Sequence, residues 1–134
     1  MKKFSLLMIL LLLVTSCSNS EDVNDFNKVR EKLKYAQKQF EKEPGVLITG
    51  SASDPKVENG IFKFSFEIDH NQISKEQLKT IIESYFIHAA EGLEDKEWRS
   101  LYNRYKFQFE ELGTDGQIKL VAEKPSNTEK IEWK

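Results

Sequence analysis

The segment IFKFSFEID, residues 61–69, alternates apolar and polar side chains without interruption. One face of such an extended segment carries three phenylalanines and an isoleucine, namely Phe62, Phe64, Phe66 and Ile68. The opposite face carries a lysine, a serine and a glutamate. This period of two predicts a half-buried β-strand. A strand with three large rings on one face needs a covering layer, so the chain must form a sheet that packs other elements on one side.

Residues 21–43 have the period of an amphipathic helix instead. Their apolar positions step by three and four residues: Phe26, Val29, Leu33, Ala36 and Phe40. Pro44-Gly45 ends the pattern. We expect this narrow seam to pack on the sheet, and the alternative is a partner helix or stalk, which the aromatic Tyr35 opposite the seam would suit.

A second helix is predicted to start within ISKEQL, residues 73–78. Ser74 can cap the helix while the Gln77 side chain reaches back to the cap, which forms a capping box. The helix that follows has a wide apolar face and Gly92 near its end. That face consists of Leu78, Ile81, Ile82, Tyr85, Phe86, Ala89 and Leu93.

The remaining strand patterns predict two hairpins. Residues 46–52 should pair with residues 61–69 across a long turn-rich connection. Tyr105, Phe107 and Phe109 alternate with polar residues, and a GTDGQ turn leads to a strand in which Ile118, Leu120 and Ala122 alternate.

Two segments have more than one interpretation. Residues 94–105 form either a short helix that presents Trp98 and Leu101 or the lead into a strand. The end of the chain either docks Ile131 and Trp133 or frays.

These elements predict an α+β fold in the order α-β-β-α-β-β. The expected sheet has four mostly antiparallel strands in two hairpins, with both helices packed on one face. A chain of 134 residues is sufficient for one domain, which we place at residues 23–134.

Charge and cysteine content exclude several function classes. The chain has 20 basic and 22 acidic residues, and no basic stripe with interleaved aromatics, so we expect no nucleic-acid binding. Loss of residues 1–16 would leave 18 basic against 22 acidic residues, a net charge of −4. The single cysteine, Cys17, permits neither an internal disulfide nor a multi-cysteine zinc site.

The amino terminus has the pattern of an export signal. Two lysines precede an apolar run at residues 4–14, interrupted only by Ser5. Eleven helical residues rise about 16 Å, which is roughly half of a hydrocarbon core and typical of a signal-peptide apolar region. The run ends in Val14-Thr15-Ser16-Cys17, an aliphatic residue, two small residues and a cysteine.

This VTSC sequence resembles the lipobox of bacterial lipoproteins. The resemblance implies removal of residues 1–16 as a signal peptide by cleavage between Ser16 and Cys17. It also implies an S-diacylglyceryl group and an N-acyl group, such as palmitate, on Cys17, so that the protein is anchored by lipid to the extracytoplasmic face of the cell membrane. Residues 17–22 would be the lipidated cysteine and a short tether. The alternative is an ordinary secretory signal with an incidental cysteine.

We find no pattern that predicts catalysis, a cofactor or a metal. His70 and His88 lie on different elements without the H-x-x-x-H spacing of a metal site, and Glu110 and Glu111 point to opposite faces of a strand. Neither a nucleophile elbow nor a phosphate-binding glycine loop occurs. We therefore expect a protein that is not an enzyme, although His70 or His88 in a cleft with a carboxylate or hydroxyl partner would argue for one.

The favoured hypothesis is a lipid-anchored, non-catalytic module that binds another envelope or cell-surface protein. In size and plan the chain is similar to small lipoproteins of prophages and conjugative elements, some of which act in exclusion or immunity. The alternative is a lipoprotein that binds a small ligand or an envelope polymer, for which a concave apolar pocket would be the distinguishing feature.

Overall fold

The computed structural model describes residues 22–56 and 59–134. The expected signal peptide, the lipobox with Cys17 and all but the last residue of the expected tether lie outside these ranges. A first helix covers residues 22–40, so residue 22, the end of the expected tether, is already helical. The elements that follow are β1 (Val46–Asp54), β2 (Ile61–Ile68), α2 (Lys75–Ala90), α3 (Asp95–Arg104), β3 (Lys106–Leu112), β4 (Ile118–Lys124) and β5 (Glu132–Trp133). The α+β class is confirmed.

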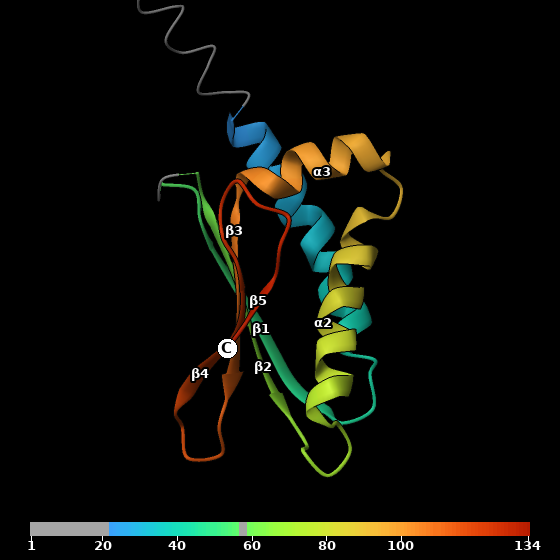
Figure 1. Cartoon of the computed structure of the whole chain (residues 1–134), viewed down its shortest axis with the longest axis vertical. Helices are drawn as coiled ribbons and strands as arrows, with labels where there is room; N and C mark the ends of the chain where they lie inside the picture. The colour runs from blue at the N-terminus through green and yellow to red at the C-terminus, as the bar shows by residue number, and fades with distance from the viewer. Residues whose placement is uncertain (1–21, 57–58) are drawn as a thin grey trace, which may run out of the picture.

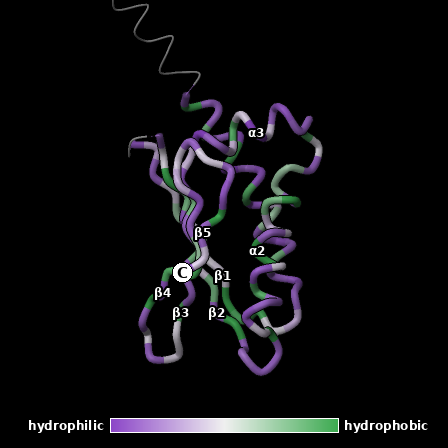
Figure 2. Tube along the Cα trace, viewed as in Figure 1, coloured by the Kyte–Doolittle hydropathy of each residue, from purple (hydrophilic) through white to green (hydrophobic). Residues whose placement is uncertain are grey.

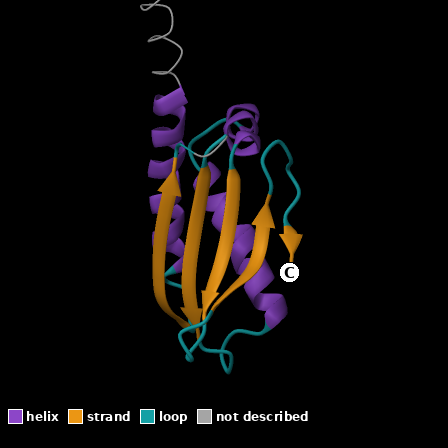
Figure 3. Ribbon diagram, turned by 90° about the vertical axis from the view of Figure 1, so that its left-hand side faces the viewer, coloured by secondary structure: helices purple, strands orange, loops and turns teal. Residues whose placement is uncertain are grey.

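The strands form one mixed sheet in the order β1-β2-β3-β4-β5. β1 pairs antiparallel with β2, β3 with β4, and β4 with β5, but β2 and β3 run parallel. Figure 3 shows the helices behind one face of the sheet, with β1 at one edge and β5 at the other. Both predicted hairpins are therefore confirmed, and the helices cover one face as expected.

The expected numbers of two helices and four strands are wrong, because the described residues form three helices and five strands, whereas the sheet is mostly antiparallel as expected, with one parallel pairing between β2 and β3. Residues 94–105, which had two interpretations, form helix α3 and bury Trp98, Leu101 and Tyr102. Together α2 and α3 carry the chain from the end of β2 back to its beginning. Parallel strands require such a crossover, whereas an antiparallel pair can be joined by a short turn. The second hairpin consequently docks parallel to the first.

The C-terminal strands contain two further differences. Trp133 belongs to a short fifth strand that pairs Ala122 with Trp133, so the end of the chain docks. In β4 the register shifts at Val121, because Phe109 pairs with Ala122 and the next residue, Glu110, pairs with Leu120. This bulge places Leu120 on the opposite face from Ala122, so the expected alternation through β4 is wrong.

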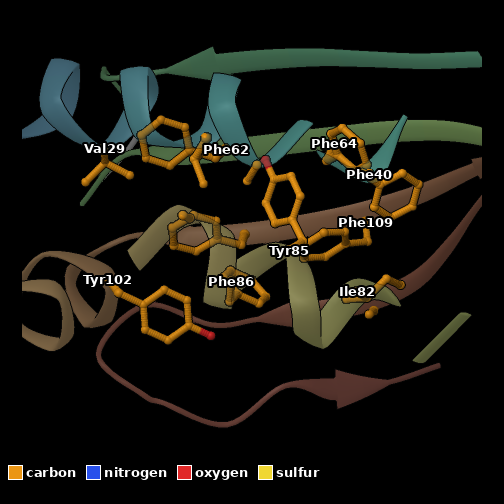
Figure 4. Packing of buried hydrophobic residues seen from close by; sticks show 14 of the residues in the cluster. Val29, Phe40, Phe62, Phe64, Ile82, Tyr85, Phe86, Tyr102 and Phe109 are labelled. Carbon is orange, nitrogen blue, oxygen red and sulfur yellow. The ribbon is translucent and has the colours of Figure 1, made fainter. Parts of the chain in front are cut away.

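The core is a continuous aromatic layer between the sheet and the helices. The Phe64 ring lies 4.8 Å from that of Tyr85 and 6.0 Å from that of Phe109, and the Phe86 ring lies 5.3 Å from that of Phe107. Figure 4 shows the rings of α2 among those of β2 and β3. The complete seam of the first helix is also buried: Phe26, Val29, Leu33, Ala36 and Phe40. The seam therefore packs on the sheet and does not serve as a stalk.

Helix α2 begins with the predicted capping box. The Ser74 hydroxyl accepts a hydrogen bond from the Gln77 backbone N–H at 3.2 Å, and the Gln77 side chain accepts one from the Ser74 N–H at 2.7 Å. Hydrophobic and hydrophilic residues alternate along α2 in Figure 2, as expected for a helix with one buried face. The cap fixes where α2 starts and so which residues meet the sheet.

We predict that Ser74→Ala lowers the free energy of unfolding by about 1 kcal/mol, because it removes the oxygen that caps α2. Urea denaturation measures this change. Thr80→Ala is the matched control: Thr80 Oγ1 donates a hydrogen bond to the Glu76 carbonyl oxygen within the same helix, and alanine is the better helix former. Equal losses in the two variants would contradict a capping role for Ser74.

Candidate functional site

The uncovered face of the sheet is mainly polar, with Leu112, Ile118 and Leu120 at its apolar end in the second hairpin. Lys63 on β2 lies 3.6 Å from Glu110 on β3, and Gln108 donates a 2.7 Å hydrogen bond to Glu123 on β4. A surface ion pair such as Lys63–Glu110 contributes little to stability. The face is therefore a weak candidate for recognition, and the candidate surfaces lie at the sheet edge and beside α2.

The first candidate surface is β1, which we call the free edge. Within the described ranges β1 has a strand neighbour on one side only, so its outward N–H and C=O groups have no strand partner. From Val46 to Ser53 the strand contains no charged residue and no proline. The Leu47 and Ile48 side chains are 57% and 55% exposed. An unpaired edge that lacks charge and proline is a template for another strand.

A crevice of about 160 Å³ lies beside this edge. Arg30 and Lys34 line it from the first helix, and the small residues 51–53 line it from β1. The two elements are connected by the Gln37 side chain, which donates a 3.1 Å hydrogen bond to Thr49 Oγ1. The crevice exists because Ser51 and Ser53, which pair with Phe64 and Phe62, are too small to fill the space beneath the first helix.

The second candidate surface is a pocket of about 180 Å³ between the start of α2 and the strands β4 and β5, which we call the α2 pocket. Its floor is apolar and continuous with the core: Ile68, Leu78, Ile82, Val121 and Trp133. The bulge at Val121 and the shortness of β5 leave this end of α2 without a full strand opposite it. Sequence analysis missed the pocket, because it depends on that bulge.

The rim of the α2 pocket is mainly basic. Its charged residues are His70, Lys75, Lys79, Glu111, Lys119 and Lys134. Lys79 lies 3.5 Å from Glu76, and Lys134 lies 3.3 Å from Glu132. Among the described residues, Lys75 and Lys119 have no carboxylate within 4.0 Å. The rim thus has an excess of positive charge in a chain whose net charge is −2.

The two histidines do not meet, as expected from the sequence. His70 pairs with the Glu111 carboxylate at the rim of the α2 pocket, and His88 Nδ1 lies 2.9 Å from a Glu91 oxygen at the C-terminal end of α2. The second oxygen of Glu91 accepts a hydrogen bond from Tyr35 at 2.8 Å. These hydrogen bonds lower the pKa of Glu91 and raise that of Tyr35. Both histidines thus have a carboxylate partner.

Ser74 lines the same pocket as His70, and its hydroxyl is used as the helix cap. The preceding turn is held by Asp69, which accepts a 2.9 Å hydrogen bond from the Asn71 N–H, so the aspartate there has a backbone role. These hydrogen bonds lower the pKa of Asp69. The His70–Glu111 pair is therefore part of the charged rim of the α2 pocket, which Ser74 also lines.

Lys124 is the largest departure from sequence reasoning. Its side chain is fully buried at the end of β4, on the same face as Ala122. The ammonium donates to the carbonyl oxygens of Pro125 at 2.8 Å, Thr128 at 2.9 Å and Asn103 at 3.4 Å. It also lies 4.6 Å from the centroid of the Tyr102 ring. Lys124 thereby ties the segment before β5 to the end of α3. The sequence does indicate this orientation, because Lys124 follows Ala122 by two residues in a strand and therefore lies on the same face.

Within residues 22–56 and 59–134, no three histidine, cysteine or acidic side chains are grouped so as to hold a metal ion. None of the helices there has the length and apolarity that crossing a membrane requires.

No protein-family model matches the chain, and no curated protein or solved structure is significantly similar to it. A functional proposal for this protein therefore rests on its own residues.

We predict that Lys124 makes stability depend on alkaline pH. Burial lowers its pKa to about 8 from an ordinary value near 10.5. Above pH 8 the unfolded chain therefore binds more protons at this group than the folded chain, and stability rises with pH. The free energy of unfolding of the native chain relative to Lys124→Met should increase by about 1–2 kcal/mol between pH 7.5 and 9.5.

Urea denaturation of both proteins across this range measures the difference. Subtracting the variant cancels the titration of exposed lysines and tyrosines that the two proteins share. A difference that stays constant, or that falls, with rising pH would contradict a depressed pKa at Lys124.

Proposed function

We propose that this protein is a lipid-anchored, non-catalytic module on the extracytoplasmic face of the cell membrane that binds another envelope protein. The lipobox-like sequence ending at Cys17 supports the anchor. The free edge β1 supports the mode of binding, which is addition of a strand from the partner. Main-chain hydrogen bonds supply affinity in such complexes, and side-chain contacts supply specificity.

The free edge carries this proposal because proteins usually protect such edges. Lysine, proline, bulges or covering loops normally prevent strand addition. β1 offers nine residues, and eight of them in succession lack both charge and proline. Its one irregularity lies between Val46 and Ile48, and the pairing with β2 is regular from there to Asp54. The regular part, residues 48–54, is long enough for a typical strand to pair along it.

The first helix determines which partner strand would fit. A strand added to β1 would run beside the crevice, where Arg30 and Lys34 point from the helix. Acidic side chains on alternate positions of the partner would face these two cations. Leu47 and Ile48 would add apolar contact at the beginning of β1. The proposed partner is therefore an envelope protein with an extended segment that carries acidic residues on one side.

The small-ligand alternative has its distinguishing feature, a concave pocket with an apolar floor, in the α2 pocket. The rings of β2 and β3 are buried under the helices and packed against one another, and four of them, Phe62, Phe64, Phe107 and Phe109, line the crevice beside β1. Exclusion or immunity, as in the small lipoproteins of mobile elements, is one role that a partner-binding module of this kind could serve.

We predict that Cys17 carries the lipid. Cells given an alkyne analogue of palmitate should label the native protein and should not label Cys17→Ala. Ser18→Ala is the neighbouring control and should retain the label. Two or three acyl chains hold a protein firmly, at about 0.8 kcal/mol per buried CH₂, so the native protein should sediment with membranes at high salt. Label on Cys17→Ala would contradict the anchor.

We predict that partner capture depends on the outward N–H groups of β1. A photo-crosslinking residue at Ile48 of the full lipidated chain, expressed in its native cells, should give one discrete protein adduct. The same residue at Gln108, on the polar face of the central strand β3, is the control and should give none.

Ser51→Pro and Ala52→Pro then test the edge itself. Neighbouring residues of an antiparallel strand point their N–H groups to opposite sides, so one proline removes a bond to β2 and the other removes only an outward donor. The variant that loses a bond to β2 should be less stable by about 1–3 kcal/mol. The variant that loses only an outward N–H should fold with unchanged stability and lose the adduct. An adduct that persists in that stable variant would exclude strand addition at β1.

A further inference from the structure

We infer that the α2 pocket binds a small organic anion, specifically a carboxylate joined to one apolar ring or short branched chain. This site is separate from the free edge. It lies toward the opposite edge of the sheet from β1, where α2 meets β4 and β5. Binding there does not require that β1 bind a partner.

The size of the pocket limits the apolar part of the ligand. A volume of about 180 Å³ is close to that of cavities that accept a benzene molecule. The floor is made of core side chains, of which Leu78 and Ile82 are buried and Val121 is partly buried. One ring or a branched chain of similar size would fill this space, whereas a long acyl chain would not.

Charge determines the polar part of the ligand. The rim has four lysines and one histidine, Glu111 is the acidic side chain that lines it, and Glu76 and Glu132 pair with Lys79 and Lys134. Lys75 approaches from the first turn of α2, and Lys119 approaches from β4, directly across the sheet from Glu111. A carboxylate between Lys75 and Lys119 would pair with the two ammonium groups that lack partners among the described residues. A cation or a neutral group would gain no such contact.

The structure also explains why this charge arrangement exists. The bulge at Val121 shifts the pairing of β4, so that Lys119 pairs with Glu111 on the helix-covered face of the sheet. Trp133 closes the far side of the pocket, and the Lys79 ammonium lies 5.8 Å from the centroid of its ring. The segment that leads to Trp133 is held in turn by the buried Lys124. The pocket therefore has a fixed wall and not a frayed chain end.

The position of the pocket suits a protein tethered at its amino terminus. Figure 1 places the start of α2 at the opposite end of the molecule from residue 22, where the first helix begins to be described. If Cys17 is held in the membrane, the α2 pocket would face away from the membrane, where small anions are accessible.

The two tryptophans provide a direct test. The full chain labelled with 5-fluorotryptophan and held in phosphatidylcholine nanodiscs should give two fluorine resonances, assigned with Trp98→Phe. Trp133 lies in the pocket, whereas Trp98 is buried in α3 and serves as an internal control. Titration with 3-phenylpropionate should shift the Trp133 resonance, with a dissociation constant below about 1 mM, and leave Trp98 unchanged.

The uncharged analogue 3-phenylpropanol has the same ring and should bind at least about tenfold more weakly, which corresponds to roughly 1.4 kcal/mol. The double variant Lys75→Gln with Lys119→Gln should bind 3-phenylpropionate more weakly by a similar factor, and Glu111→Gln should bind it more tightly. Lys96→Gln with Lys130→Gln removes the same charge elsewhere and should have no effect. Equal binding of acid and alcohol, or no Trp133 shift up to about 10 mM acid, would overturn the inference.

Discussion

The parallel pairing of β2 with β3 is the constraint on which the rest of the structure depends. It brings Phe62 and Phe64 beside Phe107 and Phe109, and these rings form the center of the core. Parallel strands cannot be joined by a tight turn, so the chain must cross the face of the sheet through α2 and α3. That crossover covers the aromatic face. It also leaves the two hairpins to finish the sheet on opposite sides, with β1 at one edge and β4 with β5 at the other.

This arrangement makes the two edges chemically different. The β1 edge is backed by the first helix but carries only small or aliphatic side chains up to Ser53. The opposite edge is closed by a two-residue strand, and its shape depends on the bulge at Val121 and on Lys124. A buried lysine with three carbonyl acceptors is costly to dehydrate, and it fixes one path for the segment between β4 and β5. The positions of Trp133 and the α2 pocket follow from that path.

Much of the fold could be predicted from local patterns. The seam of the first helix, the alternation in β2 and the capping box at Ser74 each depend on residues close in sequence. The parallel docking of the hairpins could not be predicted, because it depends on whether residues 94–105 extend the crossover as a helix. The helix is favoured because it buries Trp98, Leu101 and Tyr102 on one face, which an extended strand could not do.

The candidate sites were less accessible to sequence reasoning. The sequence does show that residues 46–53 lack charge and proline, but only the strand order shows that they form an edge. The α2 pocket depends on a bulge, and a one-residue shift in a strand has no reliable local signal. Lys124 follows Ala122 by two residues in a strand, which indicates an inward side chain, yet lysine is so rarely buried that the pattern alone favours solvent. The histidines were predicted not to converge, and they lie with separate carboxylates, Glu111 and Glu91.

Recognition through an open edge at β1 is the central claim, and amide hydrogen exchange across that strand tests it most directly. Neighbouring residues of β1 direct their N–H groups alternately toward β2 and away from the sheet. A free edge predicts an alternating pattern in the full chain from Ile48 to Ser53, with slow exchange at amides bonded to β2 and fast exchange at the amides between them. Uniformly slow exchange along β1 would show that its outward groups are already bonded, and would contradict a free edge.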